Sequence, residues 1–356
     1  MRHNRGTIFL ALLLLAVTGT ACTADVAGSS ASSGDGDEDV SLEDTSREDI
    51  SARDTFDSDT NADDVAEADA IEPDAASDVD ASDADEPIQQ TEFTIGPADR
   101  PARALLPDDY NGTTPLPVIF LFHGYTANSE SFDAYLELSP QRHDRQFIVV
   151  LPEGLTDSTG QQFWNATDFC CDNYGAEPDD VGYFVDLLDE LLEEVSADAD
   201  RVHLMGHSNG HFFANRLACD HGSRLASVVG LAGGGHWDAD DCPEDGKVSM
   251  LHIHGTSDAI IYYTGAIGLY RSTRTMTDRW AERNNCSDDS SIYDNISVSS
   301  VIWGDETTRR SYDDCPDGLS VELWSVIGGS HMPVLDDDVT DRILDFALSR
   351  TNLDAQ

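Results

Sequence analysis

The sequence predicts an α/β fold, with a mostly parallel, doubly wound sheet and helices on both of its faces. Short, continuous apolar runs alternate with longer segments of helical periodicity through residues 91–356. Such runs are typical of parallel strands that are covered by helices on both sides. The repeated order of strand, helix and strand requires right-handed crossovers. These 266 residues are also enough to build one large core.

Six apolar runs predict strands, at residues 117–122, 147–151, 201–205, 227–231, 250–253 and 321–326. Between and after them, helices are predicted at residues 181–195, 209–219, 271–283 and 339–349. The first helix has the clearest apolar face, because Phe184, Leu187, Leu188 and Leu191 recur at the spacing of successive turns.

Charge divides the chain into residues 1–22, 23–90 and 91–356. The middle part has 23 acidic residues against two arginines and almost no aromatic side chains, so it predicts a disordered, Asp-rich linker. The last part, predicted to be the catalytic domain, still has 46 acidic residues against 16 basic ones. That balance excludes nucleic acid as a partner, since phosphate binding needs clustered Lys and Arg. It also argues against electrostatic docking on anionic lipid.

The N-terminus predicts a targeting segment. Arg2 and Arg5 precede an apolar stretch at residues 8–17, which is too short to span a bilayer core of about 30 Å. Small residues and then Cys22 follow, a pattern that resembles a bacterial lipoprotein signal in which Cys22 is lipidated. The alternative is an ordinary secretory signal cleaved near Ala21. Export is expected in both cases, with membrane attachment only through the lipid anchor.

The cysteine count agrees with export. Without Cys22 six cysteines remain, and an even number in an exported protein indicates disulfides. Neighbours in sequence order predict the pairs Cys219–Cys242 and Cys286–Cys315, which leaves Cys170 and Cys171 as either a vicinal bond or two thiols. No cysteine spacing predicts a zinc site, and we expect no metal and no cofactor.

The chemistry centres on the motif G-x-S-x-G at residues 206–210. It lies between a predicted strand and a predicted helix. A sharp turn there places the serine in a strained backbone conformation, and the glycines two residues away on each side avoid clashes. The motif therefore predicts that Ser208 is a nucleophile exposed above the sheet. The alternative is a glycine-rich turn with an inert serine.

A nucleophilic serine needs a base and an acid that orients it. The α/β-hydrolase order along the chain is serine, acid and then histidine. Asp258 and His331 satisfy this order, and each follows a predicted strand at the edge where open α/β sheets bind ligands. The other histidines fit less well, because they lie before Asp258 in the chain. The alternatives are a solvated aspartate and a surface histidine.

Two backbone amides are predicted to form the oxyanion hole. One is the N–H of Asn209, directly after the nucleophile. The other is the N–H of Tyr125, after the strand that ends in His123 and Gly124, with the Tyr125 phenol as a second potential donor. Candidates for the pocket wall are Trp164, Phe163 and Tyr183, and the alternative for these aromatics is the core.

Four stretches occur in the order of a known family: LFHGYTANSESFD, GHSNGHFFANRLA, LHIHGTSD and VIGGSH. Over roughly residues 95–350 the chain resembles the extracellular polyhydroxybutyrate depolymerase and feruloyl esterase family of α/β-hydrolases. The resemblance implies serine ester hydrolysis without metal or cofactor, with Ser208, Asp258 and His331 as the triad. Where the family often has Thr-Trp-Pro-Gly after its histidine, this chain has Met-Pro-Val-Leu at residues 332–335.

Three functions follow in order of preference. The first is an exported carboxylic ester hydrolase acting on polyhydroxybutyrate-type polyester or oligomers, or on feruloyl or acetyl esters of sugars. The second is a serine peptidase of the same fold, and the third is a non-catalytic surface-binding lipoprotein. The sequence does not predict an oligomeric state.

Overall fold

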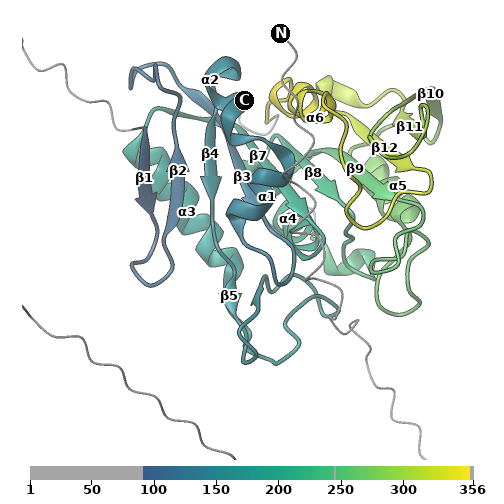
Figure 1. The fold of residues 1–356 in the computed structure, drawn as a ribbon, viewed down its shortest axis with the longest axis horizontal. Helices are drawn as coiled ribbons and strands as arrows, with labels where there is room; N and C mark the ends of the chain where they lie inside the picture. Colours follow the sequence, from purple (N-terminus) through teal and green to yellow (C-terminus); the bar gives the residue numbers. More distant parts are fainter. Residues whose placement is uncertain (1–90, 244–245, 353–356) are drawn as a thin grey trace, which may run out of the picture. The chain divides into compact units, whose positions relative to one another are not determined.

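The computed structural model describes residues 91–243 and 246–352, and its centre is one ten-stranded sheet (Figure 1). In spatial order its strands are β1 (Glu92–Ile95), β2 (Ala102–Leu105), β4 (Ile148–Leu151), β3 (Leu116–Phe122), β7 (Ala197–His207), β8 (Ser227–Leu231), β9 (Ser249–Gly255), β12 (Val321–Val326), β11 (Thr307–Tyr312) and β10 (Ser290–Ile296). A separate hairpin pairs β5 (Leu155–Thr156) with β6 (Gln162–Phe163).

The middle of the sheet is parallel. The six strands from β4 through β3, β7, β8 and β9 to β12 pair parallel with their neighbours. Antiparallel strands extend the sheet at both edges, β2 and β1 on one side and β11 and β10 on the other. In Figure 1 the strands of the first half of the described chain, blue to teal, lie on one side of the sheet, and β9 to β12, green to yellow, lie on the other. The predicted mostly parallel sheet is confirmed.

Helices cover both faces. They are α1 (Ser129–Leu136), α2 (Arg142–Arg145), α3 (Asp180–Glu194), α4 (Asn209–His221), α5 (Thr273–Arg283) and α6 (Val339–Leu348). Alternate side chains of β3 enter two separate cores, since Phe120 and Phe122 pack with α3, α4 and α5, whereas Ile119 and Leu121 pack with α1 and α6. This period of two is the reason that the apolar runs are continuous rather than alternating.

All six apolar runs form strands, although β7 begins four residues before the predicted run. All four predicted helices are present, and the ends of these helices differ from the prediction by no more than two residues. The N-terminal signal with Cys22 and the Asp-rich segment lie outside the described residues. Within the described part of the chain, no helix is both long enough and apolar enough to cross a bilayer.

The structure contains the predicted disulfides Cys219–Cys242 and Cys286–Cys315. Of the two states left open for Cys170 and Cys171, it contains the vicinal bond.

Candidate functional site

Ser208 occupies the turn between the end of β7 and the start of α4. Its backbone has φ +53° and ψ −118°, a conformation that a residue with a side chain rarely adopts. The two flanking glycines make this turn possible: a Cβ on Gly206 would overlap the backbone of Gly210, and a Cβ on Gly210 would overlap the carbonyl group of Phe122. The sequence therefore forces the predicted nucleophile into a tight turn against the end of β3.

Asp258 lies three residues after β9, and its carboxylate is fully satisfied. Its Oδ1 accepts from the backbone N–H groups of Ile260 at 2.8 Å and Ile261 at 3.0 Å. Its Oδ2 lies 2.7 Å from Nδ1 of His331 and 3.2 Å from Nε2 of His254. Burial alone would raise the pKa of Asp258, but the hydrogen bonds from the two histidines hold this pKa far below its usual value. Asp258 is thus an ionised, immobile acceptor.

His331 reaches Asp258 because the loop after β12 packs closely against the end of β9. The loop after β12 crosses the end of β9 so closely that a Cβ on Gly255 would overlap the carbonyl oxygens of Gly329 and Ser330. The His331 ring also lies 4.8 Å from the ring of His207, centroid to centroid, and its carbonyl oxygen is 3.1 Å from His207 Nε2.

The three predicted triad residues therefore come from the ends of three different parallel strands. His331 contacts Asp258 directly and also contacts His207, the residue that precedes Ser208. Among the described residues, Ser208 and His331 share no hydrogen bond, and such contacts often tighten only when substrate binds.

The predicted oxyanion donors flank Ser208. A Cβ built on Gly124 would lie 3.4 Å from Ser208 Cβ, so the backbone that leads into Tyr125 touches the predicted nucleophile. Asn209 is the first residue of α4, where helix N–H groups have no partner within the helix. In the described ranges, neither the Tyr125 N–H nor the Asn209 N–H donates to a protein acceptor. Both amides remain available to an oxygen above Ser208.

His123, which was not among the predicted site residues, holds the Tyr125 peptide in place. The N–H of Gly154 donates to His123 Nε2 at 3.0 Å, so that nitrogen has no proton. Nδ1 therefore has the proton and donates it to the carbonyl oxygen of Gly124 at 2.9 Å. In a trans peptide the carbonyl and the following N–H point in opposite directions. Fixing the Gly124 carbonyl therefore fixes the direction of the Tyr125 N–H.

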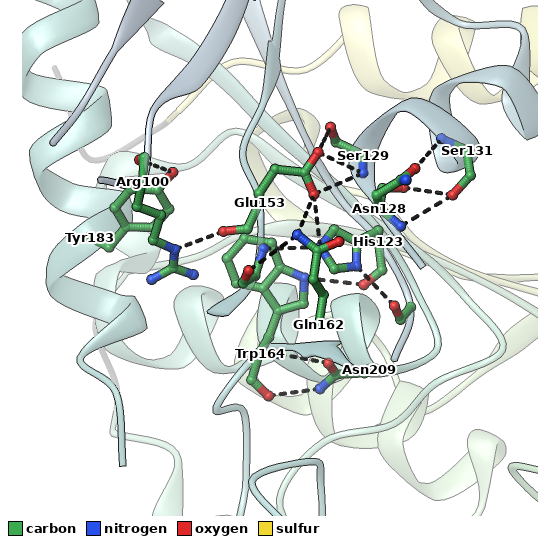
Figure 2. Close-up of polar contacts among 12 residues, drawn as sticks. Arg100, His123, Asn128, Ser129, Ser131, Glu153, Gln162, Trp164, Tyr183 and Asn209 are labelled. Atoms are coloured by element: carbon green, nitrogen blue, oxygen red, sulfur yellow. Dashed lines mark hydrogen bonds and ion pairs between the residues drawn. The ribbon is translucent and has the colours of Figure 1, made fainter. Parts of the chain in front are cut away.

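The carboxylate of Glu153 lies beside the His123 ring and forms a network of hydrogen bonds there (Figure 2). Its carboxylate accepts from the backbone and side chain of Ser129 and from Nε2 of Gln162, and it lies 3.5 Å from His123 Nε2. Burial lowers the pKa of His123, so the ring is neutral and this close approach is no charged pair. Glu153 lies two residues after the end of β4, and this position just beyond a strand is the signal that could have identified it.

The phenol of Tyr125 is not an oxyanion donor, which corrects that expectation. Its hydroxyl donates to Oδ2 of Asp157 at 2.7 Å. The ring is thereby tied to the loop that connects β5 to β6, and only the backbone N–H of Tyr125 remains a candidate donor.

The aromatic residues predicted for the pocket wall are core residues, which corrects a second expectation. Trp164 and Phe163 are fully buried, and Tyr183 is buried beneath the guanidinium of Arg100. Trp164 stacks on Phe213 with ring centroids 5.0 Å apart. It also exchanges two hydrogen bonds with the side chain of Asn209 (Figure 2). Trp164 thus supports the start of α4 from within the core.

A cavity of about 480 Å³ lies elsewhere, between α4 and α5, with Asn215, Arg279 and Trp280 among its lining residues. Ser208, Asp258 and His331 are absent from that lining. In the described part of the chain no three His, Cys, Asp or Glu side chains are grouped so that they could hold a metal ion.

Comparison with known proteins gives one family and a consistent fold. A family model described as "Putative esterase" matches residues 96–318. Feruloyl esterase D from Neurospora crassa is 26% identical over 240 residues, which are 64% of this chain and 72% of that protein. Feruloyl esterase B from Piromyces equi is 22% identical over 240 residues, which are 63% of this chain and 41% of that protein. Among solved structures, an acetyl xylan esterase from Aspergillus awamori superposes with a TM-score of 0.54 at 11% identity, over 72% of this chain and 99% of that one. That likeness shows a shared α/β-hydrolase fold.

Proposed function

The chain belongs to the family described as "Putative esterase", whose chemistry is carboxylic ester hydrolysis, and we propose that it is a serine esterase that acts through an acyl-enzyme. The observation that carries this proposal is the 2.7 Å contact between Asp258 and His331 beside the strained turn of Ser208. Three side chains of the required types, in the required chain order, lie at one edge of a parallel sheet.

The proposed mechanism assigns one task to each residue. His331 takes the Ser208 proton on Nε2 while the Ser208 oxygen attacks the ester carbonyl. Asp258 accepts from His331 Nδ1–H and stabilises the imidazolium that forms. The N–H groups of Tyr125 and Asn209 donate to the oxyanion of the tetrahedral intermediate. His331 then protonates the leaving alcohol, and a water molecule hydrolyses the acyl-enzyme by the same steps.

Feruloyl and acetyl esters of sugars are the proposed substrate class. Two of the relatives are named feruloyl esterases, and residues 96–318 match the esterase family model. Polyhydroxybutyrate-type oligomers are the other class that the sequence predicts. Both are esters of uncharged alcohols or hydroxy acids, so the same triad and oxyanion donors would serve either one.

A hydrolysis panel tests the proposal. It contains methyl ferulate, p-nitrophenyl acetate, hydroxybutyrate oligomers and a p-nitroanilide peptide, each measured with the wild type and with Ser208→Ala. We expect ester hydrolysis that the substitution lowers at least about a thousandfold, because removal of a triad nucleophile leaves only a small residual rate. Anilide cleavage without ester cleavage would indicate a peptidase. Failure of a fluorophosphonate probe to label Ser208 would indicate a non-catalytic binding protein.

We also propose that residues 91–356 are an exported catalytic domain, tethered by residues 23–90 and anchored through Cys22. The three disulfides of the described residues are consistent with an oxidising compartment. Palmitate labelling tests the anchor. Wild type should incorporate label and fractionate with membranes, and Cys22→Ala should do neither; a label that persists in the variant would contradict lipidation at this residue.

A further inference from the structure

A second histidine, His254, shares the carboxylate of Asp258. It lies on β9, four residues before the aspartate, and its side chain is almost fully buried. Its Nε2 is 3.2 Å from Asp258 Oδ2 and 2.8 Å from the carbonyl oxygen of Ile261. Its Nδ1 is 2.9 Å from the hydroxyl of Thr273, the first residue of α5. The proposed mechanism assigns no task to this side chain.

These contacts determine which nitrogen of His254 has the proton. A backbone carbonyl such as that of Ile261 can only accept, so Nε2 must be the donor. In the neutral ring Nδ1 is then the acceptor, and the buried Thr273 hydroxyl donates to it. The single Nε2–H is shared between the Ile261 carbonyl oxygen at 2.8 Å and Asp258 Oδ2 at 3.2 Å. Asp258 Oδ2 therefore accepts from His331 and, at a longer distance, from the shared Nε2–H of His254.

We propose that His254 is a positioning residue for the acid of the triad. It holds Asp258 in its ionised form and takes up part of the negative charge that would otherwise face His331. The inference rests on the proposed roles of Asp258 and His331. Without the His254 donor, Oδ2 would stabilise the His331 imidazolium more strongly, because hydrogen bonds to a carboxylate disperse its charge. His331 would then give up its proton only at higher pH.

The other titratable groups around this pair are few. On β9 itself the neighbour is His252, whose ring lies 5.6 Å from that of His254. The Tyr263 ring lies 5.7 Å from the His254 ring, and the Tyr263 hydroxyl is hydrogen-bonded to the side chain of Ser325 on β12.

His207 faces His331 from the end of β7. His211 on α4 contacts His252, and Tyr270 bonds the backbone of Tyr262 in the loop after Asp258. Of these groups, none donates a hydrogen bond to Asp258 within the described residues.

The test is the pH profile of kcat/KM on p-nitrophenyl acetate. In His254→Leu we expect the acid limb to move to higher pH by about 0.5 unit or more. We also expect kcat/KM on the plateau to fall, because Asp258 would lose one of the contacts that fix its orientation toward His331. His254→Gln keeps an N–H at the position of Nε2 and should return the limb to its wild-type pH.

His252→Leu is the matched control, because this residue lies on the same strand and face, is equally buried and does not contact Asp258. Its acid limb should stay at the wild-type pH, even if the variant is less stable. A His254→Leu limb that stays in place, or a His252→Leu limb that moves as far, would overturn the proposal.

Two further variants keep the outcome interpretable. Where His254→Leu does not fold, Thr273→Val removes the hydroxyl that holds the His254 ring. The acid limb of this variant should move in the same direction by a smaller amount, and an unmoved limb overturns the inference.

Asp258→Asn tests the underlying function separately. If that variant keeps wild-type activity, the proposed triad is wrong. If it loses activity while the limb of the His254 variants is unmoved, only the role of His254 is wrong.

Discussion

His123 donates a hydrogen bond from Nδ1 to the carbonyl oxygen of Gly124, the same peptide unit that contains the Tyr125 N–H. The opposite ring nitrogen accepts from the N–H of Gly154, in the loop after β4. One imidazole thus connects two neighbouring strand ends and determines the direction of a predicted oxyanion donor. The Tyr125 N–H is predicted to donate to the oxyanion of the tetrahedral intermediate. The hydrogen bond from His123 should therefore affect stabilisation of the transition state more than binding of the ester.

His123→Ala should therefore lower kcat more than it raises KM. Loss of a single oxyanion donor costs about a hundredfold to a thousandfold in kcat, and misdirection of the donor should cost less, about tenfold to a hundredfold. Steady-state kinetics on a soluble ester measure this. His123→Asn keeps an N–H near the position of Nδ1 and should recover most of the rate. A rise in KM alone would show that His123 does not act through the oxyanion site.

The parallel centre of the sheet could be predicted because its strands are buried on both faces and so read as continuous apolar runs. The antiparallel strands could not. β11 reads TTRRSY and β1 reads EFTI, because an antiparallel strand can face solvent on one side and there tolerates charge. Arg309 of β11, for example, forms two hydrogen bonds with Glu322 on β12, a pairing that no periodicity predicts.

The site divides in the same way. Ser208, Asp258 and His331 could be selected because motif, chain order and strand-end position all apply to them. The roles of His123 and His254 depend on which ring nitrogen faces which acceptor, and this follows only from tertiary contacts. For Trp164, nothing in the neighbouring sequence distinguishes a pocket-wall residue from a core residue that packs beneath α4.

Buried histidines should make the fold sensitive to acid. Burial lowers the pKa of His203, His207 and His211 to about 3 each, and places that of His252 well below its usual value. In the unfolded chain a histidine titrates near 6.5, so between about pH 6.5 and pH 3 the unfolded state binds more protons. The free energy of unfolding should therefore fall as the pH falls through this window. Each such histidine contributes about 1.4 kcal/mol per pH unit at most.

Urea unfolding at several pH values between 7.5 and 4.5 measures that slope. His203→Gln is informative because His203 lies away from the predicted triad and bonds only Ser227 among the described residues. Its slope should be shallower than that of the wild type by up to about 1.4 kcal/mol per pH unit. His143→Gln, which removes a half-buried histidine beside Asp108, is the comparison variant. Equal slopes for wild type and His203→Gln would contradict the argument.

The two long-range disulfides should contribute similar stability. Cys219–Cys242 and Cys286–Cys315 join residues 23 and 29 positions apart. Loop closure of that size removes about 3–4 kcal/mol of unfolded-state entropy. Replacing either pair with serines should lower the free energy of unfolding by roughly this amount, as measured in urea under non-reducing conditions. A loss below about 0.5 kcal/mol for both pairs would show that neither bond constrains the unfolded chain in this way.

Salt should stabilise the protein. Residues 91–356 have a net charge of −30, and the whole chain has a single lysine, Lys247. A compact domain with this much like charge repels itself. Raising the ionic strength from 0.1 M to 1 M shortens the Debye length from about 10 Å to about 3 Å, which screens most of that repulsion. The Tm of the full chain should therefore rise by several degrees between 0.05 and 2 M NaCl.

A triple variant tests whether charge repulsion is the cause. It removes three exposed acids that form no ion pair among the described residues, through Asp240→Asn, Asp288→Asn and Asp337→Asn. It should melt higher than the wild type at low salt and gain less from added salt, whereas a general salting-out effect would raise both proteins equally. A Tm that is constant or falls with salt would show that charge repulsion does not limit the stability of this fold.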